Sequence, residues 1–267
     1  MNFKNNILLR YMSMAPFALA FERYLECCTF QRLSFEPPVL DLGCGEGLFS
    51  YVLFSEKLDT GIDINPRELE RARELGAYVE LIHAEGDSIP KPDGSYKTII
   101  SNSVLEHIPD LAPIFREIHR LLTPDGRFYL TVPVPEFEHY TIINQSLTLI
   151  GLPNLAARYR KFCNKVIWRQ YHYFTLEEWE RLVSSFGFKV LESFTYDPKT
   201  VCLINDFLYP FSIIAVANKK LFNRWVLFPS IRRMLVYPVY LLARQILKGG
   251  DRSMQGGLAF MALARED

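Results

Sequence analysis

Acidic residues are missing from two long stretches of this 267-residue chain. Residues 139–176 contain five Lys or Arg and no Asp or Glu, and residues 207–250 contain seven and none. Since the whole chain has 30 basic and 30 acidic residues, the remainder carries 18 bases against 30 acids. A net charge of zero argues against a protein that binds nucleic acid over much of its surface. We therefore predict an acidic body with two basic insertions.

Cysteines are few, and they lack the spacing of a metal site. Their number is odd, no C-x-x-C pair occurs, and no Cys and His residues stand at zinc-ligand spacing. The sequence therefore predicts free thiols in a reducing compartment and no zinc site. The five cysteines are Cys27, Cys28, Cys44, Cys163 and Cys202.

Long uncharged apolar runs are also missing, and none reaches the ~20 residues that a transmembrane helix needs. The N-terminus is a partial exception, because Lys4 and Arg10 precede the uncharged residues 11–21 in the manner of a secretory signal. Glu22 and Arg23 continue this segment as an amphipathic helix, which is the interpretation that we favour. We expect a cytoplasmic protein with no membrane-spanning segment.

Segments typical of strands alternate with segments typical of helices through the first half of the chain. This alternation predicts βαβ units and a mostly parallel sheet, that is, an α/β fold. Prolines at 133, 135 and 153 break the rhythm, and Thr175 with Glu178 forms the pattern of a capping box. Expected strands lie at residues 39–42, 60–64, 78–83, 97–101, 127–132, 188–196 and 258–264, and expected helices at 48–55, 67–74, 111–122 and 175–185.

One domain covering residues 1–267 accounts best for a chain of this length. We expect it to begin with an N-terminal helix within residues 1–36. Basic, apolar insertions are expected at residues 133–172 and 197–256. Nothing in the sequence indicates an oligomeric state.

A glycine-rich turn between the first strand and its helix is the most informative stretch. Residues 41–47 read Asp-Leu-Gly-Cys-Gly-Glu-Gly. Glycines at alternating positions let the backbone approach a ligand closely, and the start of the helix offers free N–H groups. Leu48 stands where the dinucleotide-binding fingerprint has its last glycine, so the turn does not match that fingerprint.

Acidic residues follow the next two strands. Asp63 ends the second strand, 22 residues after Asp41, where a carboxylate can accept hydrogen bonds from both hydroxyls of a ribose. Asp87 follows the third strand, at an edge where an adenine amino group could be read. The pocket is therefore expected to take a ribosyl ligand that needs no pyrophosphate.

Five motifs in a fixed order carry a resemblance to a known family. They are VLDLGCGEG, GIDINP, AEGDSIPKPDGSY, SNSVLEHIPDL and LLTPDGRFYLTVP. Together they resemble the motifs of class I S-adenosylmethionine-dependent methyltransferases, most closely the small-molecule and lipid branch called methyltransferase type 11. The resemblance covers residues 39–132 closely and resumes at 172–179 and 186–188. It implies a Rossmann-like sheet of seven strands in the order 3-2-1-4-5-7-6, with the seventh strand antiparallel.

The resemblance also implies a cofactor, S-adenosyl-L-methionine, and a set of residues that bind it. The three glycines of the turn would approach its methionine part, and Asp63 would bind the ribose hydroxyls. Asp87 and Ser88 would flank the adenine, and Asn102 would lie beside the sulfonium. The full expected set is Asp41, Gly43, Cys44, Gly45, Gly47, Asp63, Ile64, Asp87, Ser88 and Asn102.

A base is expected if the acceptor atom is carbon or oxygen, because that atom must also lose a proton. His107, His139 and His172 are the candidates. Each has a structural alternative: packing beside the cofactor for His107, solvent exposure for His139 and a helix entry for His172. Related enzymes that methylate quinone precursors have a metal-binding Glu-x-x-Glu-His. Ser103 replaces the first of those glutamates here, so no metal is expected.

The second basic insertion combines bases, aromatic residues and prolines without any acid between residues 207 and 250. Such a segment suits contact with an anionic membrane surface. An ordinary helical lid, with its bases against the acidic body, is the alternative. A nucleic-acid partner is not expected, because aliphatic residues and prolines are too numerous in this segment.

These observations predict a cytoplasmic methyltransferase, peripheral on the inner face of the membrane, that acts on a hydrophobic or lipid-linked small-molecule acceptor. One alternative is a soluble methyltransferase of a secondary metabolite or sugar. Another is a methyltransferase-like binding protein without turnover, against which the intact glycines, Asp63 and Asp87 argue.

Overall fold

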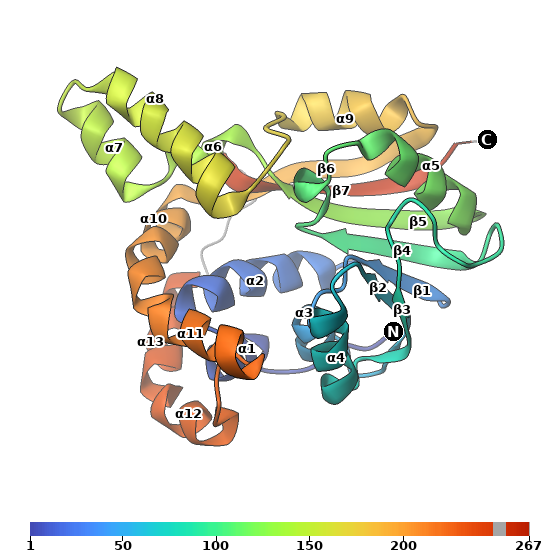
Figure 1. Ribbon diagram of the computed structural model, residues 1–267, viewed down its shortest axis with the longest axis horizontal. Coiled ribbons are helices and arrows are strands. Elements are labelled where there is room, and N and C mark those ends of the chain that lie inside the picture. Colours follow the sequence, from blue (N-terminus) through green and yellow to red (C-terminus); the bar gives the residue numbers. More distant parts are fainter. Residues whose placement is uncertain (248–254, 267) are drawn as a thin grey trace.

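The computed structural model describes residues 1–247 and 255–266 and contains a seven-stranded sheet (Figure 1). The strand order is β3-β2-β1-β4-β5-β7-β6, and β7 runs antiparallel to both of its neighbours. The order and the antiparallel seventh strand are as predicted. The strands are β1 Val39–Leu42, β2 Leu58–Asp63, β3 Tyr78–His83, β4 Tyr96–Asn102, β5 Leu122–Pro133, β6 Phe188–Pro198 and β7 Gly256–Arg265.

Helices cover both faces of the sheet and bury a separate apolar core on each (Figure 1). Helices α5 and α9 cover one face, where Phe115 and Trp179 are completely buried. Helices α1, α2, α3 and α4 contribute to the core on the other face, around Met12 and Phe30. The bounds are α1 Ile7–Met14, α2 Phe17–Phe30, α3 Leu48–Leu53, α4 Pro66–Leu75, α5 Leu111–Leu121 and α9 Leu176–Ser184.

Two details of the sequence prediction are wrong. The N-terminal segment forms two helices rather than one, because the chain is extended at Ala15 and Pro16, and a proline has no N–H with which to continue a helix. Strand β5 begins at Leu122, five residues before the expected strand over residues 127–132. Its pairing with β4 continues across these five residues through a register shift between Tyr96 and Thr98.

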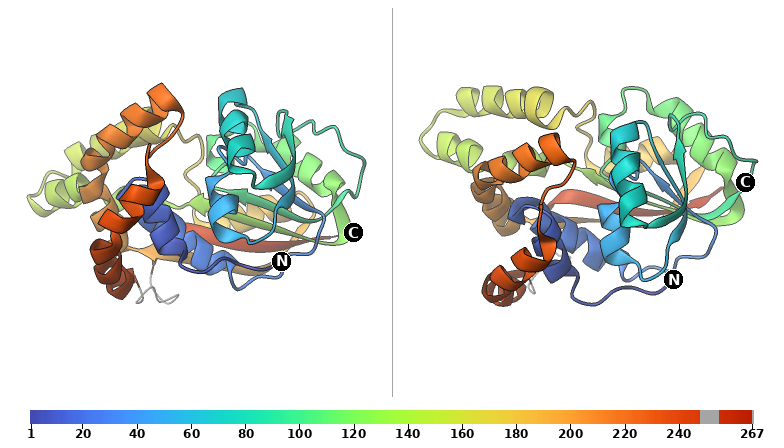
Figure 2. Two further views of the ribbon diagram at one scale, coloured as in Figure 1. Left: turned by 90° about the horizontal axis from the view of Figure 1, so that it is seen from below. Right: turned by 60° about the horizontal axis from the view of Figure 1, so that its bottom comes forward.

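Both insertions are helical and lie at one end of the sheet (Figure 2). In the first, helices α7 and α8 form a hairpin that projects away from the sheet. In the second, α10 packs on α2, and α12 and α13 contact each other. The end of this insertion, with Lys248, lies outside the described residues. The elements are α6 Pro135–His139, α7 Ile142–Leu149, α8 Pro153–Phe162, η2 Cys163–Trp168, α10 Lys199–Leu208, η3 Tyr209–Ser212, α11 Ile213–Phe222, α12 Pro229–Leu235 and α13 Tyr237–Leu247.

One helical stretch in the described residues, Lys199–Phe222, is long and apolar enough to cross a membrane by length and composition. The stretch contains charged residues such as Asp206, so it agrees with the observation that no uncharged apolar run reaches ~20 residues. Only 22% of the apolar 18-residue part of this stretch is buried. Core helices of soluble proteins meet the same criterion, so the finding by itself does not place this stretch in a membrane.

The predicted capping box is present at the start of α9. The Thr175 hydroxyl accepts from the Glu178 N–H at 3.3 Å, and the Glu178 carboxylate accepts from the Thr175 N–H at 2.8 Å. We expect Thr175→Ala to lower the free energy of unfolding by about 1 kcal/mol, because an N-terminal N–H of the helix loses its partner. Urea denaturation measures the change. Arg181→Ala, an exposed position further along α9, is the control, and equal midpoints for the two variants would contradict the prediction.

Candidate functional site

The glycine turn joins β1 to α3 with a backbone that only glycine adopts easily. Gly43, Gly45 and Gly47 have φ angles of 75°, 52° and 73°. A Cβ atom at Gly43 would lie 2.5 Å from a methyl carbon of Val104, whereas one at Gly45 would have no atom within 4 Å. The turn is therefore packed against the segment after β4 on one side and open at Gly45.

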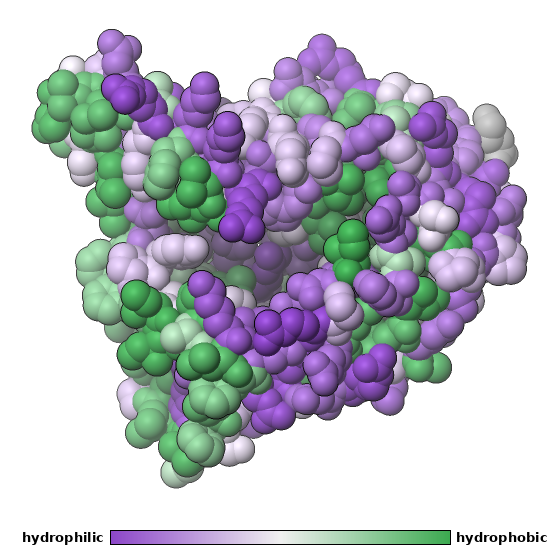
Figure 3. Space-filling view, viewed as in Figure 1, coloured by the Kyte–Doolittle hydropathy of each residue, from purple (hydrophilic) through white to green (hydrophobic). Residues whose placement is uncertain are grey.

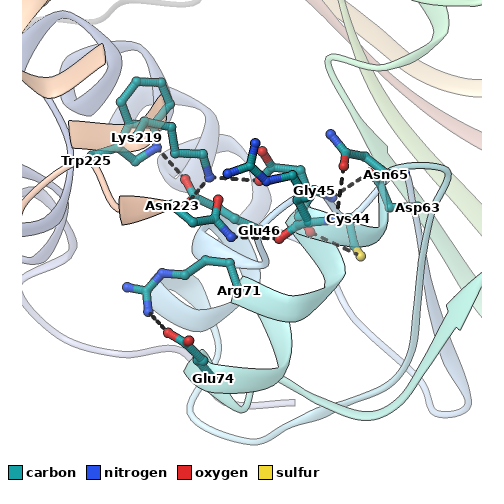
Figure 4. Close-up of polar contacts among 12 residues, drawn as sticks. Cys44, Gly45, Glu46, Asp63, Asn65, Arg71, Glu74, Lys219, Asn223 and Trp225 are labelled. Carbon is teal, nitrogen blue, oxygen red and sulfur yellow. Dashed lines mark hydrogen bonds and ion pairs between the residues drawn. The ribbon is translucent and has the colours of Figure 1, made fainter. Parts of the chain in front are cut away.

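Asp63 lies at the glycine turn, where the sequence predicts a ribose-binding acid (Figure 4). Its Oδ2 accepts from the Gly45 N–H and its Oδ1 from the Asn65 N–H, both at 2.8 Å. The Asn65 side chain in turn caps α4 by accepting from the Arg67 N–H. Ile64 between them is exposed, and its carbonyl oxygen lies 2.8 Å from Nε2 of His83. Contacts after β2 thus fix the carboxylate beside the turn.

Asp41 differs from the other members of the expected cofactor set. Its carboxylate is buried, and Oδ2 accepts from the hydroxyls of Ser50 and Tyr78 at 2.6 Å each. Burial raises the pKa of Asp41 to about 6. The expected contact of this carboxylate with the cofactor therefore does not fit its position, because both bonds tie it to α3 and β3. Asp41 instead supports the glycine turn. Cys44 is nearly buried, and its N–H donates to Ile62.

The ends of the neighbouring strands bring the remaining expected residues to the same edge of the sheet. Asp87 and Ser88 are exposed in the loop after β3, which is anchored where the Ile89 N–H donates to Glu117 at 2.7 Å. Asn102 ends β4 and accepts from the Thr131 hydroxyl at 2.5 Å. Because the carboxyl ends of parallel strands meet at one edge of the sheet, these side chains and the glycine turn lie at that edge, which we call the crevice because ligands bind there in open α/β sheets.

A second cavity, of about 230 Å³, begins directly after β4. Its walls come from α2, the segment after β4, α6 and α10, and Ser103, Glu106 and His107 are among its lining residues. The space-filling view shows a hollow in this part of the molecule, surrounded mainly by hydrophilic residues (Figure 3). We call it the β4 pocket. It adjoins the crevice because Ser103 follows Asn102.

Charged side chains that the sequence analysis missed form the wall of the β4 pocket. Arg23 donates to Glu26 at 2.6 Å and to the Ser103 hydroxyl at 3.0 Å. Glu26 also accepts from Ser103 and, at 3.1 Å, from the Tyr196 hydroxyl. Glu22 lies 3.7 Å from the guanidinium of Arg23, and burial raises the pKa of Glu22 to about 7. An amphipathic helix predicts that the charged groups of residues 22–26 face solvent, so no signal in the sequence indicated this network.

Glu106 is the most unusual group in the β4 pocket. Its carboxylate is buried, and its Oε2 has no hydrogen-bond partner among the described residues. Burial raises the pKa of Glu106 to about 8. A carboxylate with a pKa near neutrality, in a cavity, has the properties of a general base. Its place beside His107 in the Leu-Glu-His motif was the available signal.

The three histidine candidates are not brought together. His107 lines the β4 pocket, where its Nε2 lies 3.7 Å from Glu106 and burial lowers its pKa. His172 lies outside the lining: its Nε2 is 2.8 Å from the Ile108 carbonyl oxygen, and its ring packs on Phe174. His139 is also outside the lining, with Nδ1 2.7 Å from the Pro135 carbonyl oxygen. The geometry thus favours His107.

The second insertion reaches the glycine turn, a contact that the sequence did not predict (Figure 4). Lys219 Nζ lies 2.8 Å from carboxylate oxygens of both Glu46 and Glu68, and the Trp225 indole N–H donates to Glu46. Arg224 forms a further ion pair, at 2.9 Å, with Glu74. Bases of this insertion therefore do rest against the acidic body, beside the crevice.

Comparison with known proteins agrees with this geometry. A family model described as a methyltransferase domain matches residues 36–182. A ubiquinone biosynthesis O-methyltransferase from Pseudomonas aeruginosa is 33% identical over 133 residues, which cover 46% of this chain and 57% of that protein. A sterol 4-C-methyltransferase from Caenorhabditis elegans is 28% identical over 151 residues, covering 50% and 45%. The chain thus spans only about half the length of these curated relatives.

Solved structures share the fold at low sequence identity. A methyltransferase from Thermotoga maritima, described as a possible histamine N-methyltransferase, aligns with a TM-score of 0.60 and 14% identity, covering 93% of this chain and 91% of that one. A [4+2]-cyclase aligns with a TM-score of 0.54 and 17% identity, covering 92% and 82%. Since the methyltransferase-domain model matches more than half of the sequence, this chain belongs to the class I S-adenosylmethionine-dependent methyltransferases.

Proposed function

We propose that this protein transfers a methyl group from S-adenosylmethionine to a hydrophobic or lipid-linked small molecule at a membrane surface. One observation carries the proposal: the glycine turn beside Asp63 packs against Val104, and Ser103 and Glu106 of the same short segment after β4 line the β4 pocket. The donor and acceptor sites therefore adjoin. Bringing two reactants together in the correct geometry supplies much of the catalysis for such a transfer.

The residues around the glycine turn fit S-adenosylmethionine. The open space at Gly45 is what a Cβ would fill, and it accommodates a close ligand. Asp63 presents a carboxylate to the ribose hydroxyls, while Asp87 and Ser88 are exposed for the adenine and Asn102 stands at the pocket side. When bound, the sulfonium supplies an electrophilic methyl group for an in-line displacement.

Glu106 and His107 are the groups that handle the acceptor proton. The free oxygen of the Glu106 carboxylate accepts the proton from an acceptor hydroxyl or carbon in the β4 pocket. His107 lies beside this group, with its Nε2 3.7 Å from the carboxylate. His172 and His139 hold backbone carbonyl groups of the loops around the pocket. We assign these two a positioning role.

Exposed apolar side chains on both insertions support a membrane location. Soluble monomers rarely expose large contiguous apolar patches, and here exposed apolar residues extend along α7, α11, α12 and α13. Figure 3 shows them at the left of the molecule. Lys220, Arg233 and Arg244 are exposed among them and suit an anionic surface. The most exposed are Leu149, Phe211, Ile213, Ile214, Leu221, Met234 and Leu235.

The alternative, a soluble methyltransferase with a helical lid, also rests on an observation. Lys219 and Arg224 pair with acids of the body, and Arg232 donates to the backbone carbonyls of Met12 and Ala15. These bases are therefore not free for lipid headgroups. Among the described bases of the second insertion, Lys220, Arg233 and Arg244 are therefore the ones that remain for a membrane surface.

Binding of the cofactor depends on Asp63. We expect Asp63→Ala to weaken S-adenosylmethionine binding about tenfold or more, because charged hydrogen bonds to the ribose are lost. Isothermal titration calorimetry measures the affinity. Glu70→Ala, an exposed acid on α4, is the matched control and should bind like the wild type. Equal affinities for Asp63→Ala and the wild type would remove the ribose assignment.

The methylation rate should follow the ionisation of Glu106. Because its pKa is raised to about 8, the carboxylate form grows as the pH rises from about 6 to about 9, and the wild-type rate should rise with it. Glu106→Gln should lose this rise and about 100-fold or more in rate. The readout is transfer of label from S-adenosylmethionine to total lipid and polar extracts. His172→Gln should keep the pH profile, and an unchanged profile in Glu106→Gln would exclude this base.

Membrane contact is tested by flotation with liposomes. We expect the protein to float with anionic vesicles at low salt, less at high salt, and hardly at all with neutral vesicles, since screening weakens the attraction. Reversing the charge of Lys220, Arg233 and Arg244 together should strongly reduce flotation. Reversing three exposed bases of the body, Lys57, Arg73 and Lys189, should not. Recovery in the soluble fraction under all conditions would leave the lid alternative.

A further inference from the structure

An apolar groove of about 520 Å³ lies beside the β4 pocket on the surface of the second insertion. The start of α2 forms one wall, and η3, α11, α12 and the segment before α12 form the others. Arg232 is one of its few polar lining residues, and its guanidinium is already bonded to the carbonyls of Met12 and Ala15. Its central lining residues are Phe17, Phe211, Ile214, Ala215, Phe228 and Ile231.

The groove and the β4 pocket follow one another along a single seam. Cys202 and Asn205 of α10 and Tyr209 at the start of η3 line the pocket. Leu208, Ser212 and Ala215 continue the same helical stripe at intervals of three or four residues, and they line the groove. The same succession occurs on the opposite side of the seam, where Phe17 of α2 lines the groove and the next two residues, Ala18 and Leu19, line the pocket. From Cys202 to Ala215 the seam runs for roughly 20 Å at the rise of a helix.

The two ends of this seam differ in chemistry. At the inner end, both polar atoms of the Asn205 side chain are buried without a hydrogen-bond partner among the described residues, and Glu106 has one free oxygen. At the outer end, Phe211, Ile214 and Ile231 are more than half exposed. Unpartnered buried polar atoms are costly unless a ligand satisfies them. The seam therefore matches a molecule with a polar head and a long apolar chain.

We propose that the groove binds the apolar chain of the acceptor while its polar head occupies the β4 pocket, where Asn205 hydrogen-bonds to it. The inference rests on the proposed methyl transfer and adds the substrate class, an amphipathic molecule with a chain long enough to fill the groove. Each methylene buried in the groove raises the affinity about fourfold. The protein thus selects by chain length, and a short-chain analogue with the same head binds weakly.

The brominated alcohols 12-bromododecan-1-ol and 4-bromobutan-1-ol test the proposal, because bromine quenches tryptophan fluorescence on contact and Trp225 lines the groove. We expect the long alcohol to quench the tryptophan fluorescence at concentrations at least 100-fold lower than the short one. Trp225→Phe should remove most of this quenching. Equal potency of the two alcohols, or full quenching in Trp225→Phe, would overturn the assignment of the groove.

Two neighbouring isoleucines give a matched pair that separates the groove from general apolar surface. Ile213 and Ile214 are each 72% exposed, but only Ile214 lines the groove. Ile214→Asp should weaken binding of the long alcohol at least tenfold, and Ile213→Asp should leave it unchanged. Because both side chains are exposed, neither change threatens folding. Equal losses in the two variants would show binding to the open surface, as to a membrane or a second copy, and would overturn the proposal.

A titration with S-adenosylhomocysteine on the same proteins separates this inference from the proposed function. Both isoleucine variants should bind it as the wild type does, since neither residue lies at the glycine turn. If the cofactor product binds and the long alcohol does not, the groove assignment fails alone. If the alcohol binds and the cofactor product does not, the methyl-transfer proposal fails and the apolar site stands.

Discussion

Close packing between Gly43 and Val104 sets the geometry on which the rest of the site depends. Any side chain at Gly43 would collide with Val104, so the turn after β1 and the segment after β4 share one wall. The same segment after β4 carries Ser103 and Glu106, which line the β4 pocket. A transfer between two ligands requires contact at a defined distance, and this packing holds the glycine turn next to the segment that lines the pocket.

Charge in this protein is divided between tasks. The acidic body holds the second insertion through Lys219 and Arg224, whereas Lys220, Arg233 and Arg244 of the same insertion are exposed beside the apolar surface. Inside, Arg23 lies between Glu22 and Glu26, so it orders α2 against the end of β4 through Ser103. The zero net charge of the sequence hides this division, because it sums the exposed bases, the ion pairs between insertion and body, and the buried network around Arg23.

The sequence predicted what depends on neighbours along the chain. The glycine turn, the capping box at Thr175 and the position of Asp63 follow from local motifs, and the family resemblance supplied the strand order. It could not predict pairings between distant segments. Lys219 pairs with Glu46, which lies 173 residues earlier in the chain, and no periodic pattern in the sequence predicts that contact. For the same reason Glu106 was overlooked: its raised pKa comes from burial by α2, which lies far away in the sequence.

Helix α2 forms a wall of both the pocket and the groove, yet it precedes β1 in the chain. The residues that border the crevice all fall between Asp41 and Asn102, so that half can assemble early during synthesis on the ribosome. The acceptor half needs α10, which begins 169 residues after the end of α2, and Leu258 of β7, which lies still later. Such non-local contacts form late in folding. The nucleoside-binding half of a nascent chain can therefore form before the β4 pocket, which holds the second substrate, is complete.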